Sequence, residues 1–307
     1  MSREDHDVVI IGGGPAGLNC ALECFDIQLD TLVVEAKPEL GGQAPLIPHS
    51  VRNVATGRFE DGPALQRALQ ETSAILGDRV HLSHPVTDAD LDHRRIEAGG
   101  RTIAARALVI ATGAERRELA AAVDGAFGGD VTYQLEHDPE RFVGENVAVI
   151  GGGDSAALDA LALAHSGSSS VALVHRSELA GRHDIVEDVR GEPRIEDLPG
   201  WELESVGGDD RLEWIVLVQP GTGERRTLPV RGVIVKIGRM PRTEVFRGQL
   251  ELDRSGAIVV DPELRTSVDG VFAAGDVVSG AYARVAAALG HGSAAARSVL
   301  RYLEGRG

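Results

Sequence analysis

The chain has 307 residues, of which 43% are hydrophobic and 25% charged, a balance that predicts a globular protein of about two domains. Its formal charge of −16 argues against nucleic-acid binding, which requires a basic surface. No apolar run reaches about 18 residues and the charged N-terminus does not resemble a signal peptide, so no membrane span is predicted and cytoplasm is the expected location.

The first predicted elements form a βαβ unit. Residues 7–11 predict a buried strand, and residues 12–17 read Gly-Gly-Gly-Pro-Ala-Gly. A helix follows, and a second apolar strand at residues 31–34 leads into Glu35. A strand, a glycine turn, a helix, a strand and an acid at this spacing are typical of a dinucleotide-binding fold.

Each part of this unit has an expected role. Gly12 makes the tight turn, Gly14 lets the backbone approach a pyrophosphate, and Gly17 lets the helix lie close to the strand. The helix N-terminus supplies N–H donors to the phosphates. Glu35 is expected to accept hydrogen bonds from both ribose hydroxyls and to repel a 2′-phosphate. This site therefore suits FAD or NAD better than NADP.

The two cysteines, Cys20 and Cys24, both fall in the helix of this first unit. Residues four apart lie on one helix face with nearly parallel side chains, a poor geometry for a disulfide. We expect two small buried residues that pack the helix on the sheet. A redox role is the alternative.

A second βαβ unit follows later in the chain. A strand at residues 146–150 runs into Gly-Gly-Gly-Asp-Ser-Ala at 151–156, and a helix extends to about His165. Another strand at residues 170–174 leads into His175-Arg176. Two such units far apart in the chain indicate two nucleotide sites rather than a tandem repeat.

The remaining segments complete the pattern. Residues 106–113 predict a strand that meets a glycine turn, and residues 269–276 predict a strand that ends in a glycine and an acid. The turn-rich stretches 207–210 and 220–223 are expected to join antiparallel strands. The alanine-rich residues 282–303 predict a helix.

Together these motifs resemble the low-molecular-weight thioredoxin reductases and the related ferredoxin–NADP reductases, over nearly the whole chain. The resemblance implies an α/β fold of two Rossmann-like, three-layer ββα/βαβ domains. A nucleotide domain of residues 116–240 would be inserted into a discontinuous FAD domain of residues 1–115 and 241–307. The connections near 115–120 and 238–243 would act as a hinge. A homodimer is also implied. The motifs that carry the resemblance are Gly12–Gly17, Gly41–Gln43, Ala111–Gly113, Gly151–Ala156, His175-Arg176 and Gly275–Val277.

By this resemblance the first site holds FAD. Glu35 and the first glycine loop would hold the adenosine half, and Asp276 would accept from the ribityl chain, although it also fits a plain turn carboxylate. The loop from Gln43 to Asn53 is spaced differently from either relative, which leaves Asn53 open. The residues expected at FAD are Gly12, Gly14, Pro15, Ala16, Gly17, Glu35, Ala36, Gly42, Gln43, Asn53, Ala111, Thr112, Gly113, Gly275, Asp276, Arg284 and Val285.

The second site is expected to hold NADPH. The acid of the first unit is replaced by His175 and Arg176, and cations are what a 2′-phosphate requires. The family pattern is His-Arg-Arg-x-x-x-Arg, whereas this chain has Ser177 and an arginine one residue late, at 182, so the clamp is partial. NADH, a second FAD and an emptied site remain alternatives. The residues expected here are Gly151, Gly153, Asp154, Ser155, Ala156, His175, Arg176 and Arg182.

One family motif is broken. Thioredoxin reductases read Tyr-Cys-x-x-Cys-Asp where residues 133–138 read Tyr-Gln-Leu-Glu-His-Asp. Thiol–disulfide exchange needs an attacking thiolate and a partner sulfur, so a disulfide reductase of the usual mechanism is not expected. His137, with Glu136 beside it and Asp138 kept from the family motif, is a candidate proton donor. The alternative is a solvent-facing loop.

The residues around Arg284 are a further departure. After Tyr282 the family has Arg-Gln-Ala, whereas this chain has Ala283, Arg284 and Val285. By position Arg284 would lie near the pyrimidine edge of the flavin, where a cation raises the flavin potential. The expected function is electron transfer from NADPH through FAD to ferredoxin, flavodoxin, a quinone or a small oxidant, without a metal. Electrons supplied by a partner protein, and a non-catalytic flavin-binding regulator, are the alternatives.

Overall fold

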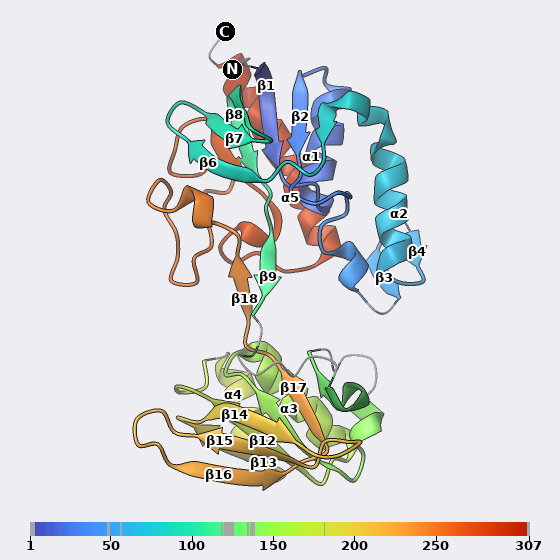
Figure 1. Ribbon diagram of the computed structural model, residues 1–307, viewed down its shortest axis with the longest axis vertical. Coiled ribbons are helices and arrows are strands. Elements are labelled where there is room, and N and C mark those ends of the chain that lie inside the picture. Colours follow the sequence, from blue (N-terminus) through green and yellow to red (C-terminus); the bar gives the residue numbers. More distant parts are fainter. Residues whose placement is uncertain are drawn as a thin grey trace. The chain divides into compact units, whose positions relative to one another are not determined.

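The computed structural model describes residues 4–47, 50–55, 57–117, 119, 126–133, 135, 139–180 and 182–305. The chain divides into two compact units: unit 1 is Met1–Glu115 with Met240–Gly307, and unit 2 is Arg116–Arg239. Unit 2 is thus an insertion, and at the two crossings β9 (Ala114–Arg116) pairs with β18 (Arg239–Pro241) (Figure 1).

Unit 1 is built on a seven-stranded sheet in the order β5-β2-β1-β8-β7-β6, with β19 also paired to β8. Strand β1 runs parallel to both β2 and β8, with Ile11 opposite Val34 and Ile110. The strands are β1 (Glu4–Ile11), β2 (Thr31–Val34), β5 (Val80–His81), β6 (Val86–Asp90), β7 (Arg95–Ala98), β8 (Arg101–Ile110) and β19 (Val271–Ala273). The other elements are α1 (Pro15–Asp26), the hairpin β3 (Val51–Val54) and β4 (Gly57–Phe59), α2 (Gly62–Ser73) and α5 (Val285–Glu304).

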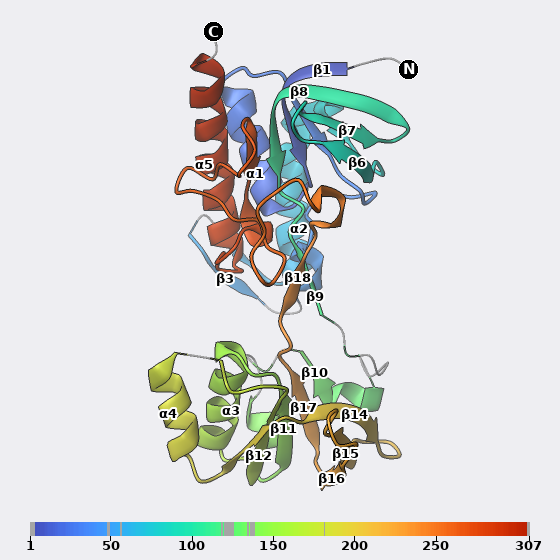
Figure 2. The same ribbon diagram turned by 90° about the vertical axis from the view of Figure 1, so that its left-hand side faces the viewer.

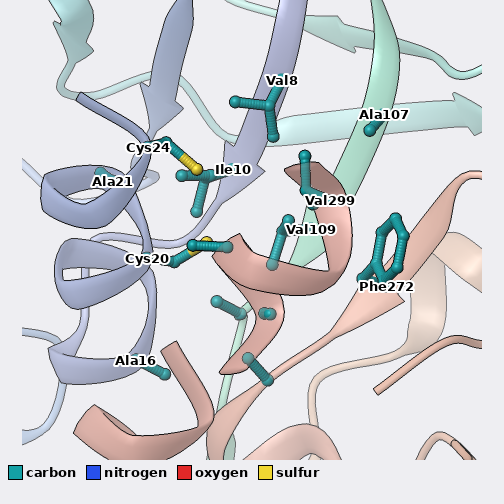
Figure 3. Packing of buried hydrophobic residues seen from close by; sticks show 14 of the residues in the cluster. Val8, Ile10, Ala16, Cys20, Ala21, Cys24, Ala107, Val109, Phe272 and Val299 are labelled. Atoms are coloured by element: carbon teal, nitrogen blue, oxygen red, sulfur yellow. The ribbon is translucent and has the colours of Figure 1, made fainter. Parts of the chain in front are cut away.

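Alternate side chains of the central strands bury opposite faces of this sheet. Val8 and Ile10 of β1 point with Val109 toward α1 and α5 (Figure 3), whereas Val9 and Ile11 pack with β6, β7 and the C-terminal loops. Cys20 and Cys24 belong to the first of these layers, fully buried and with free thiols. The expectation that they pack the helix on the sheet is confirmed.

Unit 2 has three layers (Figure 2). Its central sheet is parallel, in the order β10-β17-β11-β12-β13, with α3 and α4 packed on one face and the antiparallel strands β14-β15-β16 on the other. Its elements are β10 (Val131–Thr132), β11 (Asn146–Ile150), α3 (Asp154–Ser166), β12 (Ser170–His175), α4 (His183–Gly191), β13 (Ile195–Pro199), β14 (Glu202–Gly207), β15 (Trp214–Val218), β16 (Arg225–Pro229) and β17 (Gly232–Val235).

The predicted fold class and the two βαβ units are confirmed, as are the antiparallel strands joined at residues 207–210 and 220–223. The last helix begins at Val285 rather than Tyr282, because Arg284 has an extended backbone conformation and forms the N-cap. Within the described part of the chain, no helix is both long and apolar enough to cross a membrane.

Candidate functional site

The glycine loop of unit 1 ends at the start of α1. Gly12 has a φ of +113°, and a Cβ on it would lie 2.4 Å from the Ala111 carbonyl oxygen. A Cβ on Gly17 would lie 1.9 Å from the Gly12 oxygen, so only glycine lets the helix pack this closely on its strand. Gly14 is the N-cap and no described side chain caps it. The first-turn N–H groups are therefore a ready anion site.

Glu35 lies directly after β2 and is 7% exposed. The Gly13 N–H donates to its Oε2 at 2.6 Å, and the Lys37 N–H donates to its Oε1 at 2.8 Å. Each carboxylate oxygen has a further acceptor site. The two oxygens are thus fixed beside the glycine loop and can accept two more donors, as the hydroxyls of a ribose would supply. The residues present fit the adenosine half of FAD.

The loop after β2 returns to the glycine loop. The Gly41 N–H donates to the Gly13 oxygen at 2.8 Å. Gly42 has a φ of +60°, and a Cβ on it would lie 2.8 Å from the Cα of Gly14. The side-chain amide of Gln43 is 3.6 Å from where a Cβ on Gly113 would lie. Predicted residues that follow β1, β2 and β8 are therefore brought together at the carboxyl edge of the sheet, where such folds bind ligands.

The turn that carries Asp276 docks on the same edge. It is a short 3₁₀ turn, η6 (Gly275–Val277), and a Cβ on Gly275 would lie 2.8 Å from the Cβ of Ala16 in α1. The Gly275 N–H donates to Nδ1 of His291 at 3.3 Å. Sequence reasoning missed His291, since a histidine between two glycines in an alanine-rich helix carries no motif.

Other predicted residues lie at the borders of this region. Asn53 is exposed on β3, and Thr112 donates its hydroxyl proton to the Arg242 carbonyl at 2.7 Å. The exposed Arg284 stacks its guanidinium over the Tyr282 ring, 4.9 Å from the centroid. Val285 begins α5 and packs against the β3–β4 hairpin. Ala36, beside Glu35, is exposed.

Unit 2 repeats the glycine-loop geometry. Gly151 has a φ of +146°, and a Cβ on it would lie 2.2 Å from the Lys236 oxygen and 3.2 Å from the Cβ of the buried Ala156. Gly153 is the N-cap of α3, again without a capping side chain among the described residues. Asp154 and Ser155 open the helix and are exposed. This loop is a second anion site suited to a pyrophosphate.

The basic residues beside this second loop differ in whether their side chains are already hydrogen-bonded within the protein. His175 is buried, with Nε2 2.5 Å from Asp197 Oδ1 and Nδ1 against the Ser177 carbonyl. The Arg182 guanidinium makes two hydrogen bonds to Asp184, at 2.6 and 3.2 Å, and its pairing lowers the pKa of that carboxyl. Arg176 is exposed and forms no ion pair with any residue that the structure describes.

Of the broken family motif, His137 and Asp138, together with Glu136, lie outside the described residues. Tyr133, at the start of that motif, is buried, accepts a hydrogen bond from the Leu119 N–H at 3.2 Å and stacks under Arg116.

Asp253 fastens the segment that follows Asp276. Ser279 donates to its Oδ2 at 2.5 Å, while Ser255 and the Ala257 N–H donate to its Oδ1. Burial raises the pKa of Asp253, but these hydrogen bonds outweigh that effect and bring the pKa down to about 2 from 3.8. A carboxylate whose pKa is lower in the folded than in the unfolded protein stabilises the fold at pH values above its unfolded pKa. This stabilisation is lost as the pH falls through its folded pKa.

We therefore expect Asp253→Asn to lower the free energy of unfolding by about 1–2 kcal/mol at pH 7. The deficit relative to the unmodified protein should shrink as pH falls from 5 to 2, because protonation of the carboxylate, near pH 3.8 in the unfolded chain and near pH 2 in the folded one, progressively removes the stabilisation by its charged form. Urea unfolding at each pH measures it. A deficit that is constant over this range contradicts the role given to the carboxylate.

In a comparison with known proteins, residues 6–292 match the family model described as pyridine nucleotide-disulphide oxidoreductase. A thioredoxin reductase of Mycolicibacterium smegmatis is 35% identical, over 98% of each chain. An NADH dehydrogenase of Bacillus subtilis is 31% identical over 98% of this chain and 59% of that protein.

Among solved structures, thioredoxin reductase from Giardia duodenalis matches with a TM-score of 0.79 and 31% identity, covering 98% of this chain and 99% of that one. Thioredoxin reductase from Streptococcus pyogenes matches with a TM-score of 0.77 and 25% identity, covering 99% and 100%.

Proposed function

This chain belongs to the pyridine nucleotide-disulphide oxidoreductase family, and we propose that it passes electrons from NADPH through FAD to an acceptor that is not a disulfide. Thioredoxin reductases bind FAD and NADPH. We assign FAD to the glycine loop of unit 1 and NADPH to that of unit 2. The observation that carries this assignment is the contrast at one position, where Glu35 lies beside the first loop and His175-Arg176 beside the second.

FAD, when bound, accepts a hydride from a nicotinamide and passes the electrons on one or two at a time. In our proposal the carboxylate of Glu35 orients the ribose, and the N-terminus of α1 holds the pyrophosphate with the Gly42 backbone packed beside it. Asp276 holds the ribityl chain. Arg284, at the N-cap of α5, supplies positive charge near the flavin.

The cysteine content supports a non-disulfide acceptor. Cys20 and Cys24 are the only cysteines in the chain, and both are buried in α1. The hydrogen bond between them, together with burial, raises the pKa of Cys20 well above its usual range. The raised pKa disfavours the thiolate of Cys20, and the burial of both sulfurs keeps them from an external disulfide, whereas disulfide exchange requires an accessible thiolate. A ferredoxin, a flavodoxin, a quinone and a small oxidant are the acceptor classes we propose, for a homodimeric enzyme.

The experiment that tests this function is an anaerobic titration followed by flavin absorbance. We expect NADPH to bleach the flavin, while an aromatic disulfide and oxidised thioredoxin release no thiol above the rate without enzyme. The cysteine-free variant Cys20→Ala/Cys24→Ala is the control, and it should keep the same turnover with an artificial electron acceptor.

Other outcomes point to the alternatives. Bleaching by NADH alone, a donor class named in the Bacillus subtilis relative, would replace NADPH in the proposal. If neither nucleotide bleaches the flavin, electrons come from a partner protein, with a second FAD or no ligand at the loop of unit 2. A bound flavin that no donor reduces would leave a non-catalytic regulator. Thiol release that disappears in the cysteine-free variant would overturn the non-disulfide acceptor.

The preference for NADPH should depend on Arg176 more than on Arg182. Arg176 is exposed and unpaired among the described residues, whereas the Arg182 guanidinium is already held by Asp184. Hydrogen bonds to a charged group contribute about 1.5–3 kcal/mol. Arg176→Ala should therefore raise the Kd for NADPH about ten-fold or more and leave that for NADH unchanged.

Calorimetric titration of both nucleotides measures this preference, and Arg182→Ala is the matched control, with an expected change below about three-fold. A larger loss in the Arg182 variant than in the Arg176 variant would contradict this order.

A further inference from the structure

We propose that the imidazole of His291 is a positioning group for the flavin site of unit 1, an inference that rests on the proposed FAD binding. His291 lies in α5 and its Nδ1 accepts the backbone N–H of Gly275 at 3.3 Å, in a partly buried contact. Gly275 has a φ of +80° and precedes Asp276 in the short turn η6. The side chain of His291 therefore holds the turn that presents Asp276.

His291 lies where α5, η6 and α1 meet. A Cβ on Gly275 would lie 2.8 Å from the Cβ of Ala16, and one on the next α5 residue, Gly292, would lie 2.3 Å from the Ala16 oxygen. Ala16 belongs to the first turn of α1, close to the chain of α5 (Figure 3). A shift of the Gly275–Asp276 turn is therefore passed directly to the N-terminus of the helix that we assign to the pyrophosphate.

The hydrogen bond fixes which tautomer of the neutral His291 ring can accept it. A backbone N–H only donates, so Nδ1 must present its lone pair and the ring proton of a neutral imidazole is on Nε2. A side chain at position 291 that cannot accept this N–H leaves the turn without its partner, and FAD should then be held less tightly.

A variant that keeps an acceptor in the place of Nδ1 separates the hydrogen bond from the bulk of the ring. Asparagine is that variant, because its Oδ1 can take the place of Nδ1 as an acceptor of the Gly275 N–H.

The experiment measures the Kd for FAD by flavin fluorescence at pH 8. His291→Ala should bind FAD about five-fold more weakly than the unmodified protein, the factor expected for one neutral hydrogen bond. His291→Asn, which keeps the acceptor, should restore binding to within about two-fold of the unmodified protein.

Two results would overturn the inference alone: His291→Asn that binds FAD as weakly as His291→Ala, or His291→Ala with an unchanged Kd. Failure of the unmodified protein to bind FAD would overturn the proposed function and this inference with it.

Discussion

Glu35→Ala should lose FAD almost completely. The carboxylate accepts from Gly13 and Lys37 at 2.6 and 2.8 Å, so the substitution leaves two backbone donors without their acceptor as well as removing the proposed ribose contacts. Hydrogen bonds to a charged group contribute about 1.5–3 kcal/mol each. The loss of two at the ribose predicts a Kd for FAD at least about 100-fold higher.

The measurement is the ratio of flavin to protein after purification, followed by reconstitution with added FAD. Glu39→Ala is the matched control, since it removes an exposed carboxylate four residues further along the same loop. That variant should keep its full flavin content. A Glu35→Ala protein that purifies with stoichiometric flavin would remove the adenosine assignment for unit 1.

The two βαβ units show how much of the structure the spacing of residues in the sequence predicts. Glu35 and His175 hold equivalent places, because each comes directly after a residue that pairs with the last residue of the strand before a glycine loop, Val34 with Ile11 and Val174 with Ile150. Sequence spacing predicts this equivalence because it depends only on the length of a helix and two strands. It predicts the confirmed fold for the same reason, and it predicts the buried cysteines because four residues make one helical turn.

Spacing does not reveal what a side chain at such a place touches. His175 was expected to face a 2′-phosphate, but its ring is held by Asp197, a residue 22 positions later on the neighbouring strand β13. Arg182 is likewise engaged by Asp184. These pairings depend on which strand lies beside which, and on local rotamers, so the motif alone cannot identify them.

The contact between His291 and Gly275 is a second case of this kind. It joins a helix to a turn 16 residues earlier, and no periodicity of α5 marks the histidine as different from its neighbours. The glycines on either side of His291 differ in what they contact. Residues 290–292 read Gly-His-Gly, and the two glycines face very different surroundings.

Gly290→Ala and Gly292→Ala should therefore change stability in opposite directions. Nothing lies within 4 Å of a Cβ placed on the exposed Gly290, so alanine there gains helix propensity of about 0.5–1 kcal/mol. A Cβ on Gly292 would lie 2.3 Å from the Ala16 oxygen and 2.9 Å from the Cys20 nitrogen, both backbone atoms of α1. Relieving these contacts requires the two helices to separate.

We expect Gly292→Ala to cost about 3 kcal/mol or more, because overpacking against backbone cannot be relieved by a side-chain rotation. Since α1 also carries the phosphate-binding end, the same variant should lose FAD affinity, whereas Gly290→Ala should retain it. Urea unfolding and flavin content measured on both variants test the two effects together. Equal stability of the two variants would mean that α1 and α5 do not approach as closely as these glycines permit. The glycine loop would then owe its position to the sheet alone.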